Sequence, residues 1–361
     1  MKKVIYCAST FSHIKNFHMP YIKQLVEDNN EVIIVAGGEV VELPYVNKCI
    51  KLPIHKKILS PNNIVAAAKL RRIVSAEQPD LIYVHTTLAA CIVRIALLGY
   101  KSRPYLINMV HGYLFSKDSR VIKNKIYLGI EKILKRYTDS IVVMNEEDLS
   151  IASENKLAIE DIYLVKGVGV DKQKFLEQPI EGLTRAKLNI KNNDKIIIFV
   201  GELSKRKNQG KLIDVMSYLP DSYHLILVGD GSLQNEYQQM LDRHTAVKRI
   251  HMVGYQSNTR EYYRLSDICV SLSLGEGLPF NVVEAMLCKL PVIASDIKGH
   301  RELIDPNWLI DSSDSQAIAR FIMSKTSDEL KQEGEHNFNI AEQYTLENVF
   351  DDNYNFLKGK L

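Results

Sequence analysis

Short apolar runs rich in β-branched residues alternate along the chain with longer stretches whose apolar residues recur at helical spacing. The runs span residues 3–7, 31–36, 81–85, 105–110, 140–144 and 162–165 in the first half, and 195–201, 224–228, 250–253, 267–271 and 291–294 in the second. Apolar strands that alternate with amphipathic helices are typical of parallel sheets covered on both faces. The pattern therefore predicts an α/β protein with doubly wound, Rossmann-like sheets and a ligand at the carboxyl ends of their strands.

The alternation is interrupted at Gly167-Val-Gly-Val-Asp171, and the sequence from there to Asp194 is polar and poor in strands. A chain of 361 residues also exceeds the usual size of a single hydrophobic core. We expect two domains, 1–170 and 171–343, with ligand in the cleft that they face. Residues 344–361 carry apolar side chains at helical spacing, which predicts a final amphipathic helix from about Leu346.

Composition excludes several classes of protein. Hydrophobic residues make up 46% of the chain and charged residues 25%, as in ordinary globular proteins. The five cysteines are odd in number and widely spaced, which favours buried thiols over a disulfide framework or a zinc site. Because we find neither a signal peptide nor a run of 18 apolar residues, we expect a cytoplasmic protein. A net charge of +3 without a recognisable motif disfavours nucleic-acid binding.

The most informative segment for function runs from Ser273 to Met286, SLGEGLPFNVVEAM, and joins a predicted strand to a helix. Pro279 and the apolar residues after it place the helix start near Asn281, so the amides of the first turn are expected to be free donors for an anion. Glu276 and Glu284 flank this helix end. Since carboxylates repel phosphates, their expected partners are neutral hydroxyls, as in a sugar or a ribose.

Glu276-x7-Glu284, within Glu-Gly-Leu-Pro-Phe-Asn-Val-Val-Glu-Ala-Met, resembles the signature of the retaining glycosyltransferases of family 4, which have the GT-B fold. Further matching segments follow in the family's order over nearly the whole chain: 167–171, 201–209, 228–232, 253–255 and 266–267. The resemblance implies two Rossmann-like domains that face a cleft, and a C-terminal helix, 344–361, that crosses back to the first domain.

The resemblance also assigns roles to particular residues. It implies that Glu284 binds the nucleotide ribose, that Glu276 binds donor-sugar hydroxyls and that Lys207 neutralises the donor diphosphate. The implied catalytic residues are Glu276, Lys207 and His111, with His13 and Lys15 on the acceptor side. The remaining nucleotide-sugar-binding candidates are Arg206, Tyr255, Gly277, Leu278, Pro279, Phe280, Asn281 and Val282, of which 278–282 supply the amides of a phosphate cradle.

Some of these positions leave alternatives open. Glu202 stands where many family members have an arginine that binds phosphate, and either Arg206 or Lys205 would have to replace it, unless both are solvated loop cations. His111 ends a predicted strand, and the alternative to its contact with the donor sugar is a structural role. For His13, the alternative to an acceptor-side role is a place in a helix-capping loop. His85 suits the core and the cleft equally. The metal signal Asp-x-Asp is absent, so we expect no metal site and no cofactor.

The expected reaction is transfer of a hexose or N-acetylhexosamine, with retention, from a nucleoside-diphosphate sugar, a UDP-sugar as our first choice. The expected acceptor is a glycan or a lipid-linked molecule of bacterial surface polysaccharide synthesis. A basic predicted helix over 117–136, with Val121, Ile126, Tyr127, Ile130, Ile133 and Leu134 at its apolar positions, either buries that face or docks peripherally on the inner face of the membrane. The alternative functions are a nucleotide-sugar 2-epimerase and a non-catalytic nucleotide-sugar-binding subunit.

Overall fold

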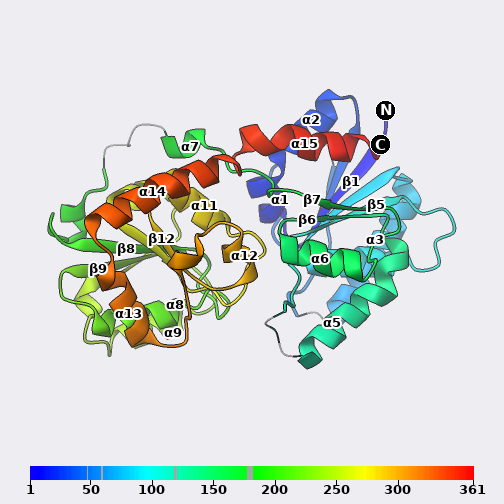
Figure 1. Cartoon of the computed structure of the whole chain (residues 1–361). Helices are drawn as coiled ribbons and strands as arrows, with labels where there is room; N and C mark the ends of the chain where they lie inside the picture. Colours follow the sequence, from blue (N-terminus) through cyan, green and yellow to red (C-terminus); the bar gives the residue numbers. More distant parts are fainter. Residues whose placement is uncertain (47, 58–59, 118, 120, 177–181) are drawn as a thin grey trace. The chain divides into compact units, whose positions relative to one another are not determined.

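A computed structural model describes residues 1–46, 48–57, 60–117, 119, 121–176 and 182–361. The chain divides into two compact units (Figure 1). Unit 1 comprises Met1–Gly169 and Val349–Leu361, and unit 2 comprises Val170–Asn348. Within the described ranges, we find no helix with both the length and the apolar character needed to cross a bilayer.

Unit 1 contains a seven-stranded parallel sheet in the order β3-β2-β1-β4-β5-β6-β7. Its strands are β1 (Lys3–Ala8), β2 (Glu31–Ala36), β3 (Lys48–Lys51), β4 (Leu81–His85), β5 (Tyr105–Val110), β6 (Ser140–Val143) and β7 (Asp161–Leu164). The strand order reverses between β1 and β4, so the loops that follow these strands border the crevice where open α/β sheets bind ligands.

The helices of unit 1 are α1 (Phe11–Phe17), α2 (Met19–Glu27), α3 (Pro61–Glu77), α4 (Thr87–Ala96), α5 (Val121–Leu134) and α6 (Glu146–Glu154). A core between the sheet and helices α3 and α4 includes Ile5, Ile33, Leu70, Ile82 and Val93. These residues belong to the apolar runs and helical stripes that the sequence shows, so burial of those positions holds the helices on the sheet.

Unit 2 contains a six-stranded parallel sheet in the order β10-β9-β8-β11-β12-β13. Its strands are β8 (Lys195–Val200), β9 (Tyr223–Val228), β10 (Ile250–Gly254), β11 (Ile268–Ser271), β12 (Val292–Ser295) and β13 (Leu309–Ile310). The order reverses between β8 and β11. All eleven predicted strands are present, with ends shifted by one residue at most. The sequence did not predict β3 or β13.

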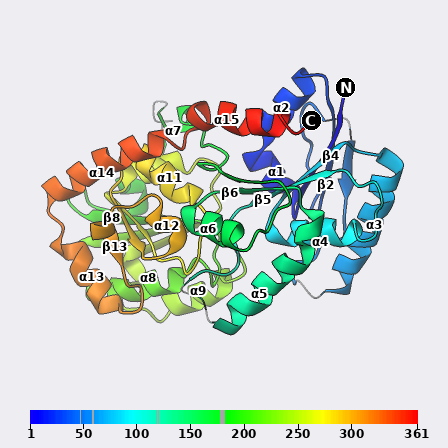
Figure 2. The ribbon, with the colours of Figure 1, turned by 45° about the vertical axis from the view of Figure 1, so that its right-hand side comes forward.

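The helices of unit 2 are α7 (Gln173–Leu176), α8 (Gln209–Val215), α9 (Gln234–Leu241), α10 (Arg260–Leu265), α11 (Phe280–Leu287), α12 (Lys298–Arg301), α13 (Ser315–Ser324) and α14 (Ser327–Glu342). Figures 1 and 2 show α11 and α14 on one face of the sheet, with α8, α9 and α13 on the other. This distribution follows from right-handed crossovers in a sheet whose strand order reverses.

The last helix, α15 (Leu346–Lys358), packs in unit 1 through most of its length. Val349, Tyr354 and Leu357 are buried, and the ring of Phe350 stacks on Tyr21 with centroids 5.0 Å apart. Asn353 donates to the carbonyl oxygen of Gly167 over 2.8 Å. The predicted return of the C-terminal helix to the first Rossmann-like unit is therefore confirmed, and α15 lies beside α2 in Figures 1 and 2.

Candidate functional site

Except for Tyr255, the sequence-predicted residues of unit 2 lie between β8 and β11, where the strand order of its sheet reverses. Lys207 is in the loop that follows β8, and Glu276 is in the loop that follows β11, the neighbouring strand. The two loops are joined by a backbone hydrogen bond of 2.8 Å from the amide of Leu274 to the carbonyl oxygen of Arg206. Parallel strands place both loops at the carboxyl ends of the strands, so Arg206 and Glu276, which are 70 positions apart, come into contact.

Three charged side chains meet there. Lys207 Nζ lies 2.8 Å from Glu276 Oε1, and Arg206 Nη1 lies 2.6 Å from Glu276 Oε2. The Lys207 and Glu276 side chains are buried, with exposed fractions of 9% and 7%, whereas that of Arg206 is 51% exposed. We call these three residues the charged cluster. It carries one net positive charge when Glu276 is ionised.

Ionisation of Glu276 is favoured by its neighbours. Burial alone would raise the pKa of this carboxyl, but the nearby charges of Lys207 and Arg206 outweigh burial and lower the pKa to about 2. Lys207 also donates to Asn281 Oδ1 over 3.3 Å, and the amide of the Asn281 side chain donates to the carbonyl oxygen of Val200. Asn281 therefore ties the start of α11 to the end of β8.

Glu284, one turn into α11, occupies a different environment. Its Oε2 accepts a hydrogen bond of 3.1 Å from the hydroxyl of Tyr263, which also contacts the carbonyl oxygen of Asn281 at 2.9 Å. Burial raises the pKa of Glu284 to about 7, although the Tyr263 hydroxyl and the charge of Lys207 act in the opposite direction. Tyr263 was not predicted from the sequence, because nothing in its sequence context links it to Glu284.

The helix start differs in one respect from the sequence-based expectation. The amide of Val282 donates to the carbonyl oxygen of Pro279 over 2.9 Å, so it is not a free donor in this structure. A tight first turn after the Pro279 cap explains this bond. Gly277, Leu278 and Pro279 are buried, and Phe280 and Asn281 are partly exposed.

Two glycines are required by close approaches of the backbone. At Gly229, where φ is +136°, an added Cβ would lie 2.2 Å from the carbonyl oxygen of Gly201, at the start of the loop that carries Lys207. At Gly299, an added Cβ would lie 2.8 Å from both the Cβ and the carbonyl oxygen of Glu276. These contacts give the Val-Gly-Asp-Gly segment a packing role and hold the Glu276 loop in place. Tyr255, by contrast, is 69% exposed after β10.

Unit 1 gathers four histidines at the carboxyl ends of β1, β4 and β5. His13 belongs to α1, His18 caps α2, His85 ends β4 and His111 follows β5. His18 and His85 are fully buried, which resolves the alternative for His85 in favour of the core. Desolvation lowers the pKa of His13 to about 4 and the pKa values of the other three well below 6.5. We call these residues the histidine cluster.

The acceptor-side candidates differ in their surroundings. His13 is partly buried, and its ring centroid lies 4.7 Å from that of His111. Lys15 is exposed on α1, two residues further on, and such residues point to different sides of a helix. The structure thus groups His13 with His111, while Lys15 faces away from that group. His18 was missed by the sequence analysis, although a second histidine five residues after His13 was a visible signal.

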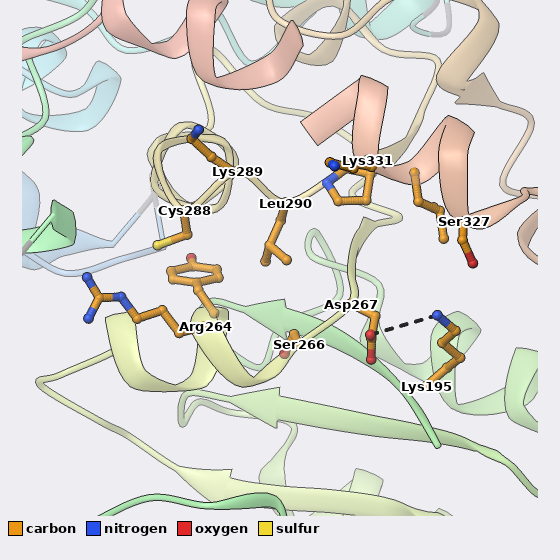
Figure 3. A pocket seen from close by; sticks show the side chains of 12 residues that line it. Lys195, Arg264, Ser266, Asp267, Cys288, Lys289, Leu290, Ser327 and Lys331 are labelled. Atoms are coloured by element: carbon orange, nitrogen blue, oxygen red, sulfur yellow. Dashed lines mark ion pairs between the residues drawn. The ribbon is translucent and has the colours of Figure 1, made fainter. Parts of the chain in front are cut away.

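Described residues also line a cavity in each unit. One of about 370 Å³ in unit 2 is lined by Lys195, Arg264, Asp267, Cys288 and Lys331 among others, and Lys195 and Asp267 form an ion pair of 3.9 Å (Figure 3). The other, of about 360 Å³ in unit 1, is lined by mostly apolar side chains that include Leu88, Phe115 and Tyr127. His111 of the histidine cluster and Thr86 also line this second cavity.

Comparison with known proteins identifies relatives for both units. The family model described as glycosyl transferases group 1 matches residues 181–343, and the model described as glycosyltransferase family 4 matches residues 21–157. EpsD of Bacillus subtilis, described as a glycosyltransferase, is 31% identical over 330 residues, which cover 89% of this chain and 86% of EpsD.

Two further proteins extend this picture. The UDP-Gal:alpha-D-GlcNAc-diphosphoundecaprenol alpha-1,3-galactosyltransferase of Escherichia coli is 27% identical over 281 residues, which cover 72% of this chain and 70% of that enzyme. The crystal structure of Anabaena HepE in complex with UDP and glucose superposes with a TM-score of 0.80 at 19% identity, and covers 99% of this chain and all of that one. The similarity to HepE shows the fold alone, which is GT-B. Since the relative at 31% identity spans almost nine-tenths of the sequence and the two family models match one unit each, the chain belongs to the group 1 glycosyltransferases and is a transferase of the GT-B fold.

Proposed function

We propose that this protein transfers a hexose or an N-acetylhexosamine from a UDP-sugar to a lipid-linked acceptor, with retention of configuration, in the synthesis of a bacterial surface polysaccharide. The choice of donor and acceptor is supported by the name of the Escherichia coli relative, which includes a UDP-sugar and a diphosphoundecaprenol acceptor. UDP is also present in structures of Anabaena HepE, which has the same fold.

The observation that carries the proposal is the charged cluster at the switch point of unit 2. Two cations held by one buried carboxylate leave a net positive charge beside the start of α11. Helix starts also attract anions through their backbone dipoles. A nucleoside diphosphate is the anion that a glycosyltransferase binds, and Glu284 is one helical turn away for the ribose hydroxyls.

In the proposed reaction, negative charge develops on the diphosphate as its bond to the sugar breaks. The ammonium group of Lys207 stabilises this charge where it forms, which is an electrostatic role of the kind that contributes most to many enzymatic rates. The leaving phosphate takes the proton of the acceptor hydroxyl on the same face of the sugar, and His111 contacts the donor sugar. We propose that transfer requires no metal ion, because Lys207 supplies the positive charge.

Helix α5 supports a peripheral membrane contact. Val121, Ile122, Ile126 and Ile133 are between 58% and 75% exposed, so these apolar positions are not buried, as the first of the two alternatives for this helix would require. Lys123, Lys125 and Lys132 are exposed on the same helix, and Arg120 lies outside the described residues. Apolar and basic side chains on one surface helix suit an anionic lipid surface. Sedimentation with anionic but not with zwitterionic vesicles tests this contact.

A panel of UDP-, GDP- and ADP-sugars tests the donor. The only tryptophan, Trp308, is buried in unit 2, so its fluorescence reports the thermal unfolding of the unit that carries the charged cluster. Ligand at about 100 times its dissociation constant adds about 2.7 kcal/mol of stability. We expect UDP-sugars to raise the midpoint most and their consumption to require an acceptor. Consumption without an acceptor would favour the 2-epimerase, and binding without any turnover would favour the non-catalytic subunit.

A further inference from the structure

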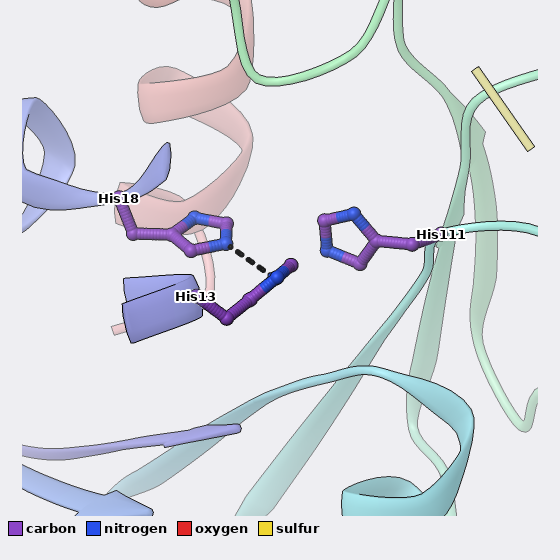
Figure 4. Close-up of side chains that lie close together, drawn as sticks. All are labelled: His13, His18 and His111. Atoms are coloured by element: carbon purple, nitrogen blue, oxygen red, sulfur yellow. Dashed lines mark hydrogen bonds between the residues drawn. The ribbon is translucent and has the colours of Figure 1, made fainter. Parts of the chain in front are cut away.

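The histidine cluster brings together more ring nitrogens than the proposed transfer uses. His18 Nε2 lies 3.2 Å from His13 Nε2, and His111 Nε2 lies 3.4 Å from His85 Nδ1. Figure 4 shows the rings of His13 and His18 with facing nitrogens, and the ring of His111 with an edge toward them. Only His111 has a role in donor binding as proposed above, so the convergence of the other rings needs a separate explanation.

The spacing of these nitrogens is close to that of a metal site. One ring nitrogen each of His13, His18 and His111 lies within 4.8 Å of the others. Tetrahedral zinc with bonds of 2.0–2.1 Å separates neighbouring ligand nitrogens by about 3.3 Å. The pair formed by His13 and His18 already has this separation, and the third nitrogen needs to approach by about 1.5 Å at most. A rotation about the side-chain bonds of the partly exposed His111 provides such a movement.

The surroundings of the rings also suit a bound metal. The hydroxyl of Tyr6 lies 3.3 Å from His18 Nδ1, so it can accept a hydrogen bond from Nδ1–H, which leaves Nε2 on the side of His13 unprotonated and available as a ligand. Metal-binding histidines nearly always have such a partner on their other nitrogen. His85 does not belong to the proposed ligand set, and its Nδ1 lies next to His111 Nε2.

We propose that His13, His18 and His111 bind one divalent transition-metal ion, with Zn²⁺ as the best match, and that the bound ion inhibits transfer. Three imidazole ligands suit zinc, whereas Mg²⁺ and Ca²⁺ prefer oxygen ligands. Inhibition follows because the ion occupies His111, which contacts the donor sugar in the proposed reaction. The inhibitory effect rests on the proposed function, whereas metal binding does not.

A second pair of close histidines provides a matched control. His224 Nδ1 lies 3.1 Å from His251 Nε2 in unit 2. Asp194 contacts the opposite nitrogen of His224, at 3.2 Å from Nε2, so these three groups do not converge on one point. The variant His251→Gln therefore removes a histidine from a close pair without affecting the proposed site.

The test is a titration of the chelator-treated full-length protein with Co²⁺, whose visible absorption distinguishes four-coordinate from six-coordinate binding. We expect one four-coordinate Co²⁺ per chain, displaced by Zn²⁺. His18→Gln and His13→Gln should weaken binding more than about 100-fold, because loss of an outer partner alone costs 10–100-fold. His251→Gln should bind as the parent does. Since His18 is fully buried, the partly exposed His13 keeps the test valid if His18→Gln does not fold.

Three results would overturn the proposal in whole or in part. The site is wrong if Co²⁺ binds the parent only in six-coordinate form, or if it binds His13→Gln as tightly as the parent. The inhibitory role is wrong if transfer continues undiminished at full Zn²⁺ occupancy. The Co²⁺ titration requires no transfer activity, so failure of the proposed function and failure of the metal site give different results.

Discussion

Replacement of Glu284 by glutamine should stabilise the protein without ligand and weaken nucleotide binding at the same time. The carboxyl of Glu284 has a pKa of about 7 in the folded chain, raised by burial from 4.5. Above pH 7 the folded protein therefore holds Glu284 as an ionised carboxylate, although burial of this side chain favours the neutral form. Glutamine keeps the shape of the side chain, and its amide oxygen can accept the hydrogen bond from Tyr263.

The magnitude follows from the two pKa values. A difference of about 2.5 in pKa corresponds to about 3 kcal/mol. Between pH 4.5 and pH 7 the folded state binds more protons at Glu284 than the unfolded state, so this residue lowers the free energy of unfolding as the pH rises. Glu284→Gln should thus be more stable than the parent by about 3 kcal/mol at pH 8 and by less than about 1 kcal/mol at pH 5.

The assay is urea unfolding of both proteins at pH 5 and pH 8, followed by the fluorescence of Trp308, which reports unit 2. Titrations of other groups cancel in the difference between variant and parent. Glu335→Gln is a suitable control, because Glu335 is an exposed carboxylate of the same unit and its replacement should change the stability little. With UDP present, the variant should gain less stability than the parent. A difference between variant and parent that is the same at both pH values would refute the reasoning.

Three further predictions concern the charged cluster and the C-terminal helix. Lys207→Ala should lower the transfer rate by about 100-fold to 1000-fold, while Lys211→Ala, which removes a partly exposed lysine from α8, should not. Equal rates in Lys207→Ala and the parent would remove Lys207 from the reaction. Glu276→Gln should bind UDP more tightly in calorimetry, because Lys207 and Arg206 lose their shared anion, and should lose the added affinity due to the sugar; weaker UDP binding would contradict this. Truncation after Asn348 removes the buried side chains of Val349, Tyr354 and Leu357, and burial of each contributes about 1.5–3 kcal/mol to stability. Circular dichroism should therefore show that unit 1 melts at a lower temperature, while the fluorescence of Trp308 should show no change in unit 2.

The sheets were predictable because strands buried on both faces leave continuous apolar runs. The run from Glu31 to Ala36 became β2 with the same ends, and the helix expected from about Leu346 begins there. The strand β3, Lys48–Lys51, has exposed lysines at both ends, and β13 has two residues, so neither leaves an apolar signal. Periodicity also predicted α5, but it left open whether the apolar positions of this helix are buried or exposed. Spacing shows which residues share a helix face, and it does not show whether that face is covered.

The charge states of the site could not be predicted, because spacing carries no information about the environment of a carboxyl. Glu276 and Glu284 stand in one short motif, yet the pKa of the first is lowered to about 2 and that of the second is raised to about 7. The difference arises because Glu276 contacts two cations from the loop after β8, while the direct partner of Glu284 is a neutral hydroxyl. Opposite shifts in neighbouring carboxyls are typical of sites where each group has its own task. At neutral pH, Glu276 is a fixed anion that holds Lys207 and Arg206 together, and Glu284 is divided between its two forms. A nucleotide that forms a hydrogen bond with Glu284 therefore favours one of the two protonation states of this carboxyl, so its binding is coupled to the uptake or release of a proton there. The charge of Glu276 stays constant.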